Sequence, residues 1–129
     1  QGRDVAGGEQ NCNLGQFRLM IRDRYVNVIH PDLVYNRGLI CTLQWAMAEV
    51  AGIPIVPYSS KHNPELATLL HFAVVCWHTG PFMEFPARSV TYDDWYQPQF
   101  RIESGGLVEV PTGLGLGISY DPLFEMQLL

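Results

Sequence analysis

Short β-like runs alternate with amphipathic helical stripes over residues 5–85, and this order limits the possible folds more than any other feature of the chain. Apolar spacings of three and four predict helices at 14–24, 38–51 and 64–77. Apolar or β-branched runs that end at glycine or proline predict strands at 4–6, 25–29, 53–56 and 81–85. The order β-α-β-α-β-α-β predicts an α/β fold with parallel strands and helical crossovers.

Such a unit is not self-contained. Four parallel strands with helices on one side leave two unpaired sheet edges and one open apolar face. A complete (β/α)₈ barrel takes about 250 residues, whereas this chain has 129. We therefore expect part of a barrel rather than a whole one.

Composition and charge exclude several function classes. Apolar residues make up 47% of the chain and charged residues 16%, which excludes intrinsic disorder. A net charge of −5 with eight scattered basic residues argues against binding a nucleic-acid backbone. The longest apolar stretch, 66–77, is too short to span a bilayer. Three widely spaced cysteines suit buried thiols in a reducing compartment. We expect a cytoplasmic protein with no nucleic-acid or membrane partner.

Ionisable and hydrogen-bonding residues follow every predicted strand. They are Glu9, then His30 and Asp32, then the segment 57–62, and finally Glu84. Chemistry collects at the carboxyl ends of parallel strands. Carboxylates that converge there suit a hard divalent cation, magnesium or manganese rather than zinc. We interpret His30 as a residue that flanks this site, and His71 and His78 as structural.

Five motifs in this order resemble the enolase superfamily, in its mandelate racemase and muconate-lactonizing branch. They are VAGGE at 5–9, VIHPD at 28–32, IPIVPY at 53–58, PFMEF at 81–85 and GGLVEVPTGLGLG at 105–117. The resemblance implies the C-terminal part of a (β/α)₇β TIM-like barrel, with strands five to eight within residues 1–86. Residues 87–129 would form a tail that returns toward a capping domain. The capping domain and the first strands have no counterpart in this sequence.

The resemblance also assigns roles to matching positions. Glu9 matches a ligand of a catalytic Mg²⁺ ion. Asp32 matches the acid that hydrogen-bonds a catalytic histidine on the next strand. Glu84 matches an acid at the end of the last strand that orients substrate or bonds the developing enolate.

The chain departs from the family pattern on the seventh strand. Many relatives have Pro-His there, and this chain has Pro57-Tyr58. Either His62 or Tyr58 could take the catalytic role, although a phenol with a pKa near 10 is the poorer base at neutral pH. The neighbouring residues Ser59, Ser60 and Lys61 suit binding of a polyhydroxylated substrate.

The resemblance implies an Mg²⁺-dependent acid-sugar dehydratase. Such an enzyme removes the proton alpha to a carboxylate and eliminates a β-hydroxyl group through an enediolate. A racemase, epimerase or cycloisomerase of the same branch is the first alternative, and an inactive fragment or non-catalytic remnant is the second. The expected partners are a small carboxylate, an acid sugar, and either further copies of the chain in a homo-oligomer or a second chain that supplies the rest of the barrel.

Overall fold

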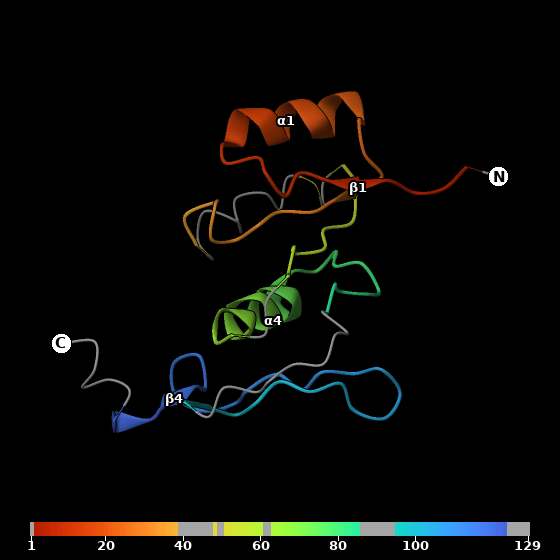
Figure 1. Ribbon diagram of the computed structural model, residues 1–129. Helices are drawn as coiled ribbons and strands as arrows, with labels where there is room; N and C mark the ends of the chain where they lie inside the picture. The colour runs from red at the N-terminus through yellow and green to blue at the C-terminus, as the bar shows by residue number, and fades with distance from the viewer. Residues whose placement is uncertain (1, 39–47, 49–50, 61–62, 86–94, 124–129) are drawn as a thin grey trace.

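The structure, a computed structural model, describes residues 2–38, 48, 51–60, 63–85 and 95–123 (Figure 1). The elements in chain order are β1 (Ala6–Gly7), α1 (Leu14–Asp23), β2 (Val28–Ile29), α4 (Glu65–Val75), β3 (Tyr96–Gln97) and β4 (Ser119–Tyr120). No helix in these described ranges is long and apolar enough to cross a membrane.

The predicted parallel array is present. β1 pairs with β2 in parallel, with Gly7 opposite Ile29. Single-residue parallel bridges extend the array from Ile29 to Ile55 and from Ile55 to Thr79. Four chain segments therefore lie side by side in sequence order and point the same way, as expected for successive strands of an α/β barrel.

Helix α1 was predicted at 14–24 and ends one residue earlier, at Asp23. The helix begins at Leu14 because the Asn13 side chain, at the cap, accepts a hydrogen bond from the backbone N–H of Gln16. It ends because Arg24 adopts the left-handed conformation, with φ at 49°. Phe17 is fully buried and packs against Gly8, just after β1, where a Cβ would come within 3.0 Å of its ring.

Helix α4 is shorter than the predicted 64–77. It buries one stripe, made of Leu66, Ala67, Leu69, Leu70 and Phe72. The helix ends at Val75 because Cys76 takes an extended backbone conformation, with φ at −82° and ψ at 115°. The predicted range is therefore wrong at its end, where Trp77 lies past the helix with its side chain 95% exposed.

The fourth strand position also differs from the prediction. It lies at Thr79 rather than at 81–85, where the structure has no strand. Backbone hydrogen bonds fix it, because Ile55 N–H donates to the His78 carbonyl and Gly80 N–H donates to the Ile55 carbonyl. The neighbouring strand approaches closely at Gly80, where a Cβ would lie 2.5 Å from a methyl carbon of Val56.

The predicted helix at 38–51 falls largely outside the described residues. Within it, the structure describes Gly38, Ala48 and Ala51, and Ala48 is helical and fully buried. The helix as a whole therefore stays a prediction.

The tail folds back on itself beside α4 (Figure 1). β3 and β4 pair antiparallel, and the chain between them turns where Glu103 N–H donates to the Leu107 carbonyl. This turn makes residues 105–111 the return arm of the tail. On α4, His71 Nε2 lies 3.2 Å from the Leu116 carbonyl oxygen, which joins the tail to the helix.

Candidate active site

The parallel array brings successive strand ends to one edge. Past β1 and β2, His30 N–H donates to the Gly7 carbonyl at 2.9 Å. On the next strand, Tyr58 N–H donates to the Pro31 carbonyl at 2.8 Å. These bonds extend the ladder beyond the assigned strands. They place the residues that follow each strand next to one another, as the sequence predicts.

Strand alternation separates these side chains into two faces. Ile29 and Pro31 are buried on the side that packs against the helices, whereas His30 and Asp32 are half-buried on the other side. Tyr58 has the same alternation relative to its buried neighbours. His30, Asp32 and Tyr58 therefore share the face that would line the interior of a barrel.

His30 lies at the centre of this group. The Tyr58 ring meets its imidazole edge-on, with centroids 5.4 Å apart and an interplanar angle of 71°. Burial lowers the pKa of His30, and the negative charges of Glu84 and Glu9 partly oppose this shift. Both carboxylates therefore lie close enough to act electrostatically on one imidazole. The structure thus packs Tyr58 against a residue that the sequence analysis placed only at the margin of the site, and the charges of Glu9 and Glu84 act on that residue.

Asp32 has a structural contact of its own. Its Oδ1 accepts hydrogen bonds from the backbone N–H groups of Val34, at 2.7 Å, and Tyr35, at 3.2 Å. These bonds tie the turn that follows the second strand. The other carboxylate oxygen, Oδ2, has no hydrogen bond within the described ranges, so it remains available for the predicted histidine. His62 and Lys61 lie outside the described residues, and their predicted roles stay predictions.

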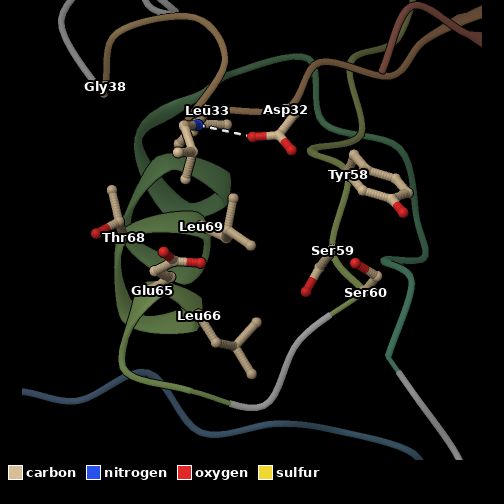
Figure 2. A pocket seen from close by; sticks show the side chains of 11 residues that line it. Asp32, Leu33, Gly38, Tyr58, Ser59, Ser60, Glu65, Leu66, Thr68 and Leu69 are labelled. Carbon is tan, nitrogen blue, oxygen red and sulfur yellow. Dashed lines mark hydrogen bonds between the residues drawn. The ribbon is translucent and has the colours of Figure 1, made fainter. Parts of the chain in front are cut away.

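A pocket of about 190 Å³ lies beside these strand ends (Figure 2). Asp32, Tyr58, Ser59 and Ser60 line it together with the first turns of α4. Ser59 is buried and Ser60 is exposed at the edge. The structure therefore gathers four of the predicted site residues around one cavity.

The sequence analysis missed the helical wall of this pocket. Glu65 and Thr68 of α4 supply polar groups, and Leu66 and Leu69 supply apolar ones. Their spacing of three on one helix was the only available signal, since it places them on neighbouring positions of one face. That spacing does not say which strand end the face meets.

The described residues do not by themselves form the expected magnesium site. No group of three or more His, Cys, Asp or Glu side chains in these ranges lies close enough to hold a metal ion. The Glu9 carboxylate is half-buried and has no hydrogen bond or ion pair in the described part of the chain. A carboxylate placed in this way fits a role as one oxygen ligand among several.

The family assignment follows from the comparison with known families. The model of the family described as enolase C-terminal domain-like matches residues 2–123. The chain belongs to this family. Among curated relatives, arabinonate dehydratase of Saccharolobus solfataricus is 29% identical over 124 residues, 94% of this chain and 32% of that protein. D-galactonate dehydratase of Ralstonia pickettii is 24% identical over 132 residues, 95% of this chain and 34% of that protein.

Solved structures agree with the family. A member of the enolase superfamily from Polaromonas sp. JS666 matches with a TM-score of 0.80 and 28% identity, over 96% of this chain and 33% of that one. A protein from Burkholderia xenovorans bound to magnesium and fumarate matches with a TM-score of 0.84 and 16% identity, over 97% of this chain and 31% of that one. The enolase-type chain thus spans about a third of the length of these relatives, and it has the fold of the C-terminal part of their α/β barrel.

Proposed function

We propose that this chain is the C-terminal part of an Mg²⁺-dependent acid-sugar dehydratase. The observation that supports the proposal is the parallel array, which brings Glu9, His30 and Tyr58 past neighbouring strand ends, with the Glu84 charge acting on the same imidazole. The dehydratase names of two curated relatives support the substrate class, a sugar acid.

The chemical problem is the weak acidity of a proton alpha to a carboxylate. A magnesium ion, when bound, stabilises the negative charge that develops on the carboxylate oxygens. In this proposal Glu9 supplies one of its ligands. A base on the seventh strand, His62 or Tyr58, takes the proton, and Asp32 orients that base and sets its basicity.

The remaining residues position the substrate. Glu84 is exposed, follows the fourth strand position at Thr79, and acts electrostatically on His30. Ser59, Ser60 and Lys61 bind hydroxyl groups of the sugar chain. Loss of water from a 2,3-dihydroxy acid, as the α-proton and the β-hydroxyl, gives an enol, which converts to a 2-keto-3-deoxy acid.

A panel of sugar acids tests the proposal. The assembled enzyme, in which these residues are joined to the rest of the barrel, is incubated with each acid and Mg²⁺, and the ketone product is trapped and measured. We expect a 2-keto-3-deoxy acid from at least one member of the panel, and none when EDTA removes the metal. Absence of ketone product from every acid would contradict a dehydratase.

A racemase or epimerase is the second candidate. One neighbour of the same fold carries the name mandelate racemase/muconate lactonizing enzyme, from Jannaschia sp. CCS1. This activity would change the configuration at the α-carbon without loss of water. Chiral chromatography of the recovered acids separates the two reactions, since only racemisation or epimerisation returns a stereoisomer of the starting acid.

A further inference from the structure

The proposed chemistry leaves His30 without a role, although its side chain lies among the groups assigned to the site. Its backbone is fixed by the bond from its N–H to the Gly7 carbonyl, and its ring is fixed edge-on against Tyr58. The ring therefore has a defined orientation at the edge where the strands end.

The two ring nitrogens of His30 have different surroundings. Nε2 is closed off from solvent and has no hydrogen-bond partner in the described part of the chain. Nδ1 is not among the closed-off atoms, and no described residue bonds to it either. The nitrogen that can meet a ligand is thus Nδ1. Because no described protein group hydrogen-bonds Nδ1, a ligand can supply its hydrogen-bond partner.

The charges around His30 restrict what that ligand group can be. Glu84 and Glu9 both act on the imidazole electrostatically. A third carboxylate, placed against Nδ1, would be repelled by these two negative charges. A hydroxyl group carries no charge, and it can both donate and accept a hydrogen bond. It therefore suits Nδ1 whether that nitrogen carries the ring proton or the lone pair.

We propose that Nδ1 of His30 hydrogen-bonds a hydroxyl group of the substrate and so selects polyhydroxylated acids over simple carboxylates. The inference rests on the proposed function, because it takes the ligand to be a sugar acid. It goes beyond that function by naming the residue that recognises a substrate hydroxyl group through a hydrogen bond. Because the contact does not involve the α-proton, His30 acts in binding rather than in proton abstraction.

Two substitutions and two ligands test the inference. In the assembled enzyme, His30→Phe keeps a planar ring beside Tyr58 but removes both nitrogens. His30→Asn keeps a polar group near the position of Nδ1. His71→Phe, on α4 and in contact with the tail, is the matched control. The ligands are D-galactonate, which has several hydroxyl groups, and fumarate, which has none. Dissociation constants are measured calorimetrically in the presence of Mg²⁺, so the readout does not depend on turnover.

We expect His30→Phe to weaken D-galactonate binding about tenfold or more, because one buried hydrogen bond is lost. Fumarate binding should change by less than about twofold by the same reasoning. His30→Asn should recover most of the D-galactonate affinity, and His71→Phe should leave both affinities unchanged. Unchanged D-galactonate binding in His30→Phe, or equal losses of affinity for both acids, would overturn this inference and leave the proposed function standing. Failure of the wild-type enzyme to bind D-galactonate and other sugar acids would overturn the proposed substrate class, and this inference with it.

Discussion

Glu9 is the residue on which the proposed metal-dependent mechanism depends. Its carboxylate is half-buried at the end of β1 and makes no hydrogen bond or ion pair in the described ranges. Its charge acts on His30 together with that of Glu84. In the proposed function this carboxylate is one oxygen ligand of a cation that the rest of the barrel helps to hold.

The first prediction concerns this carboxylate. Glu9→Gln in the assembled enzyme should lower the affinity for Mg²⁺ and reduce kcat/KM about 100-fold or more, because a neutral amide is a weaker ligand for a hard cation. Activity measured across a Mg²⁺ titration checks both effects. Glu109→Gln, on the exposed return arm of the tail, is the control. Wild-type Mg²⁺ dependence in Glu9→Gln would remove Glu9 from the metal site.

The second prediction separates the two candidate bases. Tyr58→Phe keeps the ring that packs on His30 and removes only the hydroxyl. We expect it to retain kcat within about tenfold, since a phenol with a pKa near 10 is a poor base at neutral pH. We expect His62→Asn to lose activity by about 100-fold or more. The reverse order in steady-state kinetics would assign the base to Tyr58.

At the scale of elements, the close approach of the third and fourth strands depends on Gly80. A Cβ at this position would lie 2.5 Å from a Val56 methyl carbon, and the β-branched valine has little freedom to move away. Gly80→Ala should therefore lower the free energy of unfolding by about 1–3 kcal/mol. Gly2→Ala is the control, because no atom lies within 4 Å of its Cβ. The denaturant midpoint of the assembled enzyme is measured for both variants. Equal midpoints would contradict the prediction, because they would mean that the strands accommodate the added methyl group without loss of stability.

Helix α1 could be predicted almost to the residue because its cap and its apolar spacing are both local. Asn13 caps the first turn and Phe17 faces the core, and each depends only on neighbouring residues. The fourth strand could not be predicted in the same way. The run at 81–85 looks like a strand from its apolar side chains, but pairing occurs at Thr79, because Gly80 lets the neighbouring strand approach. That contact is between distant parts of the chain.

The same distinction holds for the site. That Asp32 and Tyr58 lie together could be predicted, because the ends of parallel strands meet at one edge. The catalytic and metal-binding roles of Glu9, Asp32, Tyr58 and Glu84 stay predictions. The wall formed by Glu65 and Thr68 could not be predicted, because it depends on how α4 packs against the segment after the third strand.

On the scale of the whole molecule, the chain exposes surface that a complete barrel would cover. Trp77 is 95% exposed and Phe82 is 83% exposed. Val28 and Val56 are only half-buried on the face opposite the helices. Large apolar side chains in such positions usually mark contact surfaces. We therefore expect the functional unit to contain more protein than these 129 residues.

Intact mass of the natural protein under denaturing conditions tests this expectation. A mass of about 40–45 kDa is what a barrel with a capping domain requires, and we predict that value. A mass of 14.6 kDa would mean that a second chain supplies the missing strands. If a protein of that mass purified without any companion chain, the dehydratase proposal would fail.

Removal of the proton alpha to a carboxylate is the central claim, and solvent deuterium exchange tests it most directly. The assembled enzyme is incubated with Mg²⁺ and D-arabinonate or D-galactonate in D₂O, and the α-proton is followed by NMR. We predict that the α-proton signal disappears as a deuterated 2-keto-3-deoxy acid forms, and that Glu9→Gln abolishes both changes. Persistence of the α-proton in every sugar acid tested, with the wild-type enzyme folded and loaded with Mg²⁺, would contradict the account.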